Sequence, residues 1–533
     1  MVRLHAWRLA PAWFLISGCL SDKQLTESFQ KPSAPAMEKS SSPDVVQASA
    51  RLSAPSADKL FPPVLPASNQ STSKPSVRPA FTGNIELNTV LNSVDQNFPL
   101  LLAIEEERNI AAGLRLSTEG AFDTTVRART TGQRGTYDSG RMDVTVEQLT
   151  TLNGLSYFGG YRLSNGDFPP YYGFYKTGDG GEFRGGFQLP LLRNAPIDRP
   201  RAALRQAQIA ESLADPIIQR SRLDYFRAAT RTYWNWIAAG EQYYVAQDLF
   251  KIAQERQAGF ETQFQRGAIA EIIVIDNRRL IAERLGNLAQ AERRLQQTSI
   301  ELSLFLRDEA GQPMLPTLQQ MPRTLLTSKP LSPKADTLDA DLQAAVNNRP
   351  ELRRFSLLRQ RVEVDLQFAS NQLLPNLTTG VAGSTDLGPM KKNSDGTPGD
   401  SQVLEGTVMF DMPLQWRDAT GRQAQARALL TQLQWQEQFA REQIGADVQD
   451  AISNLDRSLE RIARAEEEVK VAQQVTELEF TRFRAGQSTL LEVNLRELAA
   501  AGAKARLIDA LAEFYRAVAD FRAALGLDLA PTR

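Results

Sequence analysis

The chain has 533 residues, with 61 Lys plus Arg against 62 Asp plus Glu, and a formal net charge of −1. This balance excludes the basic field that attracts nucleic acid. The chain has one histidine, His5, and one cysteine, Cys19. If residues 1–18 are removed and Cys19 is modified, no His-based triad, no His or Cys zinc site and no thiolate nucleophile is left. We therefore predict a protein that is not an enzyme and that uses no metal, cofactor or nucleic acid.

Residues 1–18 have the pattern of a bacterial export signal. The basic segment Met1 to Arg8 precedes a brief apolar stretch, Leu9 to Ile16, which is too short to cross a bilayer. Two small residues stand before Cys19, which resembles the lipobox, in which the cysteine is lipidated and becomes the mature N-terminus. The alternative is an ordinary signal peptide with an incidental cysteine. We expect an acylated Cys19, and outer-membrane sorting because Leu20 follows it rather than aspartate.

Residues 19–80 are rich in Ser, Pro, Ala and Gln. Such a composition cannot bury enough apolar surface to offset the entropy of ordering the chain. We predict a flexible tether between the lipid anchor and a folded body.

From residue 81 the same order of features occurs twice. Gly267 and Gly486, each in a Phe-Arg-x-Gly or similar turn, lie 219 residues apart, and Pro190 and Pro413, each after a short apolar run, lie 223 apart. A repeat this long is a duplicated half-domain rather than a solenoid unit. We predict a first structural repeat at 81–310, a connector at 311–334, a second repeat at 335–527 and a tail at 528–533.

Long helices are the main predicted elements of each half. Short helices with an Asn-x-Pro-type break open each half, at about 85–116 and 338–372. Long helices follow at about 198–264, interrupted at Pro216, and at 421–483, where apolar residues repeat with coiled-coil spacing. A helix of that length extends roughly 90 Å. Returning helices are predicted at about 271–306 and 490–525.

Between the short and long helices, each half contains a pair of candidate strands. These are 122–129 and 183–191 in the first half, and 377–383 and 404–410 in the second. Their length suits a tilted transmembrane strand of roughly 10 residues. We expect loops at 130–182 and 384–402. The first holds many aromatic residues among glycines and could be an interfacial girdle, a lid, or a loop packed on its own side chains.

The order and spacing of these elements resemble the TolC-like outer membrane efflux protein family over about residues 81–527, most closely from Phe483 to Val493. The resemblance implies a mixed α/β membrane protein, in which a very long α-helical coiled-coil barrel continues a transmembrane β-barrel. Four strands per chain would close as a homotrimer with twelve strands. Such channels join a periplasmic adaptor and an inner-membrane pump in a tripartite efflux or secretion system. The protein would then lie in the bacterial outer membrane, lipid-anchored, with a periplasmic helical domain.

The resemblance also assigns residues to functional positions. Pro190 and Pro413 would be strand–helix junctions, and the tips that contact the adaptor would contain Arg266, Gly267, Arg484, Gly486 and Gln487. Asp276 and Glu492 match positions at which family members narrow the tunnel with carboxylates, and Arg278 or Arg496 could bridge them. The alternative is that both carboxylates are solvated charges at helix starts, stabilised by the helix dipole.

Two other functions stay open at this point. A non-porous, lipid-anchored periplasmic coiled-coil scaffold would explain the helices and the anchor, but not two matched strand pairs with their prolines. A free-standing porin would explain the strands, but porins lack such long helices.

Overall fold

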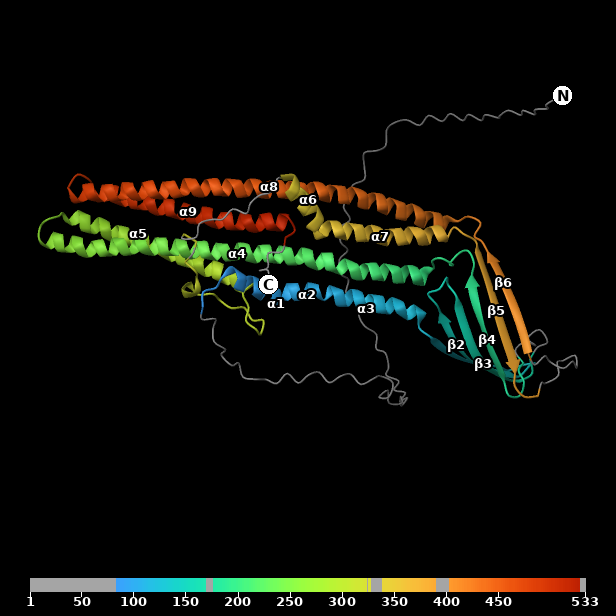
Figure 1. The fold of residues 1–533 in the computed structure, drawn as a ribbon. Coiled ribbons are helices and arrows are strands. Elements are labelled where there is room, and N and C mark those ends of the chain that lie inside the picture. Colours follow the sequence, from blue (N-terminus) through green and yellow to red (C-terminus); the bar gives the residue numbers. More distant parts are fainter. Residues whose placement is uncertain (1–82, 169–175, 324, 327–337, 390–401, 528–533) are drawn as a thin grey trace, which may run out of the picture. The chain divides into compact units, whose positions relative to one another are not determined.

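The structure is a computed structural model that describes residues 83–168, 176–323, 325–326, 338–389 and 402–527 (Figure 1). The predicted export signal at 1–18, the tether at 19–80 with Cys19, and the tail at 528–533 lie outside the described residues. The described part of the connector contains the short helix η3 (Leu318–Gln320).

The helices of both halves lie close to their predicted positions. The first half contains α1 (Leu87–Asn97), α2 (Pro99–Glu105), α3 (Glu107–Glu119), η1 (Gly120–Phe122), α4 (Arg199–Gln265) and α5 (Glu271–Ser303). The second half contains α6 (Leu338–Asn348), α7 (Pro350–Asn371), α8 (Arg417–Arg484) and α9 (Leu490–Ala524). In the ranges that the structure describes, none of the helices is long and apolar enough to cross a membrane.

Helix α4 continues through Pro216, so the interruption predicted there is wrong. A proline inside a helix removes one backbone hydrogen bond and costs about 3 kcal/mol. Pro216 is buried, and α4 packs along its length against α3, α5, α7 and α9. Burial of apolar surface by a 67-residue helix outweighs this single local cost.

The helices pack as two long antiparallel pairs, α4 with α5 and α8 with α9, and α4 also packs against α9. The core between them contains Phe226, Trp236 and Phe514, which are fully buried. The rings of Trp234 on α4 and Tyr515 on α9 stack with centroids 4.1 Å apart. These aromatic contacts join the first half of the chain to the second.

One antiparallel sheet contains six strands in chain order. They are β1 (Thr125–Gln133), β2 (Ser139–Leu149), β3 (Ser156–Gly166), β4 (Glu182–Pro190), β5 (Asn376–Asp386) and β6 (Gln402–Asp411). The predicted strands correspond to β1, β4, β5 and β6. The prediction of four strands per chain is therefore wrong, because β2 and β3 lie between β1 and β4.

The hairpin β2–β3 lies in the segment 130–182, which the sequence analysis assigns to a loop. Its turn contains Asn153 and Gly154, with φ of 45° and 74°. The connection between the strands has six residues, 150–155, and within it the Leu155 amide donates to the Leu152 carbonyl at 2.9 Å, so Asn153 and Gly154 are the central pair of a tight turn that favours Asn-Gly. Adjacent Gly159 and Gly160 break the side-chain alternation of β3, which hides the strand in the sequence.

Candidate functional site

The α4–α5 and α8–α9 turns, at the helix ends opposite the sheet (Figure 1), have the same geometry. In the first, Gly267 has φ of 71° and the Ala268 amide donates to the Gln263 carbonyl at 2.9 Å. In the second, Gly486 has φ of 74° and the Gln487 amide makes the corresponding bond, also at 2.9 Å. Glycine takes positive φ at low cost, and this bond pattern ends a helix. The chain therefore reverses in the same way in both halves.

A small apolar cluster holds the two turns together. Phe260 of α4, Val274 of α5 and Leu490 of α9 are buried in it, and the Phe483 ring of α8 lies 6.4 Å from that of Phe260. The residues predicted to contact an adaptor are all exposed: Arg266, Gly267, Arg484, Gly486 and Gln487. The cluster thus presents both turns as one unit.

Glu492 caps helix α9. Its carboxylate accepts hydrogen bonds from the Thr489 amide at 3.0 Å and the Ser488 hydroxyl at 2.8 Å, and the Glu492 amide donates to the Thr489 hydroxyl at 3.3 Å. This is a capping box. The bonds, led by that from the Thr489 amide, hold the pKa of Glu492 below its ordinary value of 4.5. The carboxylate is therefore charged at neutral pH, and its contribution to stability is lost as pH falls through the lowered pKa.

Asp276 lies in the second turn of α5 and accepts a hydrogen bond from Arg279 Nε at 3.0 Å. Arg278, which the sequence analysis offers as a bridge between carboxylates, pairs instead with Glu261 of α4 at 3.0 Å. Among the described residues, no hydrogen bond or ion pair joins Asp276 to Glu492. Both carboxylates lie near the tips, and each bonds to its own helix.

A buried ion network beyond the tips, which sequence reasoning missed, joins the two halves of the chain. Glu497 of α9 pairs with Arg256 of α4 and with Arg284 of α5, the latter at 2.7 Å. Arg256 also donates to the Asn494 side chain at 3.1 Å, and Arg284 to the Leu249 carbonyl at 2.7 Å. No more than a tenth of each charged side chain is exposed. Helices α4, α5 and α9 are thus fixed to one another about three to five turns from the tips.

The strand register places all charged side chains of the sheet on one face. Directly opposite residues share a face, and successive residues along a strand point to opposite faces. The pairs Arg129 with Asp143, Asp143 with Arg162, Arg162 with Glu182, and Glu182 with Asp386 connect five strands on one face. The same register adds Arg127, Arg141, Glu147, Arg184, Glu405 and Asp411.

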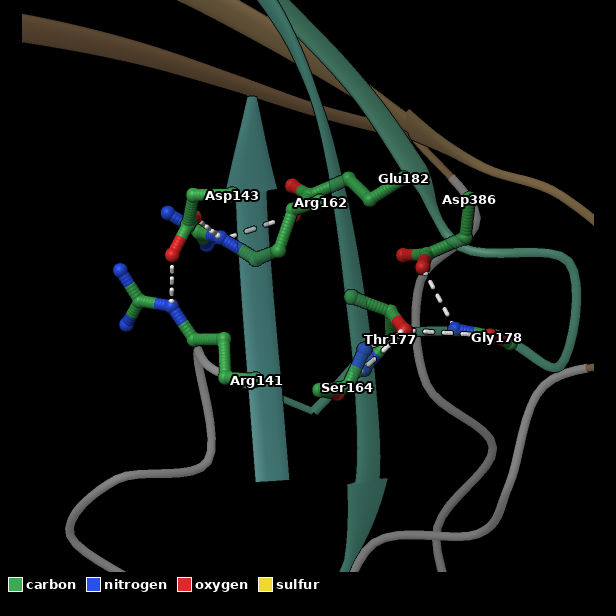
Figure 2. A network of polar contacts seen from close by, with 8 residues as sticks. All are labelled: Arg141, Asp143, Arg162, Ser164, Thr177, Gly178, Glu182 and Asp386. Carbon is green, nitrogen blue, oxygen red and sulfur yellow. Dashed lines mark hydrogen bonds and ion pairs between the residues drawn. The ribbon is translucent and has the colours of Figure 1, made fainter. Parts of the chain in front are cut away.

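Opposite charges neutralise one another on this charged face (Figure 2). Arg162 donates to Asp143 at 2.9 Å and to Glu182 at 3.3 Å, while Arg141 pairs with Asp143 at 2.5 Å. The four side chains come from β2, β3 and β4, so the ion pairs cross the inserted hairpin. Such a face suits contact with water rather than with hydrocarbon.

The segment just before β4 is hydrogen-bonded to β3 and β5 at the end of the sheet where β4 begins. The Thr177 amide donates to the Ser164 hydroxyl of β3 at 2.8 Å, and the Gly178 amide donates to Asp386 of β5 at 2.7 Å (Figure 2). Both Ser164 and Asp386 belong to the charged face. These contacts link β3 to β5 across the beginning of β4.

The opposite face is apolar and much of it is exposed, with Leu404 at 80% and Val408 at 74%. Each strand has 9 to 11 residues, the length that a tilted transmembrane strand needs. Apolar side chains on one face and charged ones on the other are typical of barrel strands between lipid and water. The apolar face contains Val126, Met142, Val144, Val146, Tyr157, Tyr161, Leu163, Phe183, Phe187, Leu189, Leu377, Val381, Leu404, Val408 and Phe410.

Both junction prolines stand between a strand and a long helix. Pro190 is the last residue of β4, and Pro413 comes two residues after β6. Proline has no amide proton for strand pairing, so it suits a strand end. After Pro190, the Asp198 carboxylate accepts a hydrogen bond from the Arg201 amide at 2.9 Å and caps α4.

Comparison with known proteins gives a family match for the second half of the chain and a shared fold over most of its length. Residues 342–527 match the sequence model of the family described as outer membrane efflux protein. No curated protein matches the chain in sequence. The outer-membrane channel OprN shares the fold with a TM-score of 0.62 at 15% identity, over 84% of this chain and 91% of that one.

Two further channels show the same likeness at similarly low identity. The CmeC outer membrane channel of Campylobacter jejuni has a TM-score of 0.58 at 13% identity, over 83% of this chain and 85% of its own. The outer membrane protein VceC of Vibrio cholerae has a TM-score of 0.58 at 14% identity, over 83% of this chain and 96% of its own. Residues 342–527 thus match the outer membrane efflux protein family in sequence, and most of the chain shares its fold with solved outer membrane proteins.

Proposed function

We propose that three copies of this chain close into an outer membrane channel that continues as a helical tunnel, and that the channel carries solutes outward in a tripartite efflux or secretion system. The separation of charged and apolar side chains between the two faces of the sheet carries this proposal. In a closed barrel the charged face lines water and the apolar face meets lipid. The family match supports an efflux role in the outer membrane.

The two edges of one chain support ring closure. β1 and β6 each pair with one strand, and an open edge in lipid would leave backbone groups without partners. On the helix that precedes β1, Ile110 and Leu114 are exposed, and on the helix that follows β6, Trp435 and Phe439 are exposed. If the β1 edge of one copy contacts the β6 edge of the next copy, and the rotation between copies closes, the copies form a ring. The number three rests on the resemblance to TolC-like channels.

A lipid-anchored scaffold without a pore is the competing function. Outer-membrane fractions distinguish the two, because a barrel trimer resists detergent at room temperature and dissociates on heating. We expect a heat-modifiable trimer in the outer-membrane fraction, released only by detergent. A detergent-released protein that stays monomeric and does not change its mobility on heating would support the scaffold and contradict the channel.

Cys19 is proposed as the lipid anchor after removal of residues 1–18. Cys19→Ser is expected to abolish incorporation of radiolabelled palmitate completely, because no other thiol exists in the chain. Label that persists in this variant would show that the acyl chain is attached elsewhere. A Ser17→Ala variant, which keeps a small residue before the cysteine, serves as the control and should keep the label.

The exposed turns are proposed to face the adaptor, with the pump beyond it. Gly486→Pro should disturb the second turn at a cost of about 1–3 kcal/mol, because proline cannot adopt the φ of 74° found there. We expect crosslinking to a periplasmic adaptor to fall sharply. Gly259→Ala, in open space within α4, is the control and should crosslink normally. Full crosslinking by Gly486→Pro would mean that this turn is no docking tip.

Asp276 and Glu492 are proposed to narrow the tunnel. If they form carboxylate rings, Asp276→Ala, Glu492→Ala and the double variant should raise single-channel conductance in planar bilayers and weaken block by divalent cations. Thr489→Ala is the matched control, because it removes part of the α9 cap and keeps the carboxylate. It should cost about 0.5–2 kcal/mol of stability without changing conductance. If conductance and block by divalent cations are unchanged in all three variants, Asp276 and Glu492 do not narrow the tunnel, and they act only as charges near the starts of their helices.

A further inference from the structure

The hairpin β2–β3 pairs with the neighbouring strands over most of its length. β2 pairs with β1 from Ser139 to Glu147, and β3 pairs with β4 from Ser156 to Arg162. Side chains on both strands follow the same division into a charged and an apolar face. A loop lying over a barrel opening would not need this division. The hairpin therefore has the features of a wall segment.

The turn of the hairpin is fixed at the helix end of the sheet. A Cβ added to Gly154 would lie 2.7 Å from the Asn194 carbonyl oxygen, 2.7 Å from Pro190 Cγ and 3.0 Å from Arg201 Nη2. Pro190 is the last residue of β4, Asn194 lies in the connection that follows, and Arg201 lies in the first turn of α4. The inner end of the hairpin thus packs directly against the junction between sheet and helices.

The hairpin makes the sheet as wide as the helix layer that continues it. Helices α3, α4, α7 and α8 pack side by side in that order, and packed helices lie about 8–10 Å apart, so the layer spans about 24–30 Å between its outer axes. Neighbouring strands lie about 4.8 Å apart perpendicular to their axes, and a barrel tilt of about 40° widens this spacing to about 6.3 Å around the ring, so six strands span about 31 Å and four about 19 Å. Six strands therefore match the width of the helix layer more closely than four.

We propose that the β2–β3 hairpin enlarges the barrel wall, so that three copies close it with eighteen strands, each copy pairing its β1 edge with the β6 edge of the next. This inference rests on the proposed three-copy channel. Barrel diameter grows roughly linearly with strand number, so the outer opening would be about 1.5 times as wide as that of a twelve-stranded barrel. The part of the duct within the membrane would then admit bulkier solutes than twelve strands allow.

Cryo-electron microscopy of the full chain in lipid nanodiscs tests this count. We expect eighteen strands around the ring at the level of β4. A variant that lacks residues 139–166 should give a ring with twelve strands, because β1 ends and β4 begins at the same end of the sheet and can be joined directly. Removal of an even number of strands also leaves the side chains of the four remaining strands on the same faces. A full-chain ring with twelve strands overturns this inference alone. Absence of any ring overturns the proposed channel as well.

Cysteine labelling tests the same point without the deletion. Thr145 and Val146 are neighbours on β2 that point to the charged and the apolar face. In a Cys19→Ser background, Thr145→Cys in vesicles should react with a water-soluble maleimide at least about tenfold faster than Val146→Cys, since lipid covers the apolar face. Equal reaction rates would place the hairpin outside the wall and overturn the inference.

Discussion

Glu497→Ala is expected to lower the free energy of unfolding by about 3–5 kcal/mol, because it leaves two buried guanidinium groups without a counter-charge. Arg256 and Arg284 approach Glu497 from α4 and α5, and both are almost fully buried. Loss of the network should loosen α9 from the first half of the chain. Chemical denaturation of the detergent-solubilised protein, followed by circular dichroism, measures the change.

The pair between Glu468 and Arg506 provides the matched control. It is also a Glu–Arg contact between two helices, α8 and α9, at 2.5 Å, but 47% of the Glu468 side chain and 59% of the Arg506 side chain are exposed. Solvent screens such an exposed pair, so Glu468→Ala should change the free energy of unfolding far less than Glu497→Ala. If Glu497→Ala were as mild as Glu468→Ala, the buried network would not hold the halves together.

Gly154→Ala is expected to cost about 2–4 kcal/mol, because the turn needs a positive φ and the added methyl group meets backbone and ring atoms. Gly154 has φ of 74° and a Cβ there would lie 2.7 Å from the Asn194 carbonyl oxygen. Thermal unfolding in detergent measures the loss of stability. Gly159→Ala on β3 is the control, since its Cβ would meet no atom within 4 Å. Equal effects of the two changes would contradict the close packing of the turn on the β4–α4 junction.

The helices were predictable because their signal is long and periodic. The stripe from Ile444 to Ile462 contains six apolar residues, which follow one another at steps of three or four over several turns of α8. The ends of α4 and α8 were also predictable, because Gly267 and Gly486 supply the positive φ that ends each helix. Local chemistry decides these features, so one sequence is enough to reveal them.

The β2–β3 hairpin could have been predicted from the sequence, but only from local signals at its turn and in its first strand. The pair Asn153 and Gly154 is a strong indication of a hairpin turn, and β2 alternates apolar and charged residues before it. The glycines of β3 lack side chains to continue the alternation, and pairing on both sides compensates for this in the folded sheet.

The buried network could not have been predicted from the sequence. Arg256, Arg284 and Glu497 come from three helices, and the two arginines lie more than 200 residues before Glu497. Nothing in local periodicity tells which of the many charged residues will meet across a helix interface. The Thr489–Glu492 capping box was visible as a Thr-x-x-Glu pattern before a helix, and it gives Glu492 a structural role that is compatible with the proposed aperture.

Single-channel recording in planar bilayers tests the channel most directly. Purified full chain, reconstituted as a heat-modifiable trimer, should produce stable current steps whose size rises in proportion to the conductivity of the salt solution, since water fills the duct. Folded trimer that inserts into the bilayer yet gives no current steps would contradict an outer membrane channel.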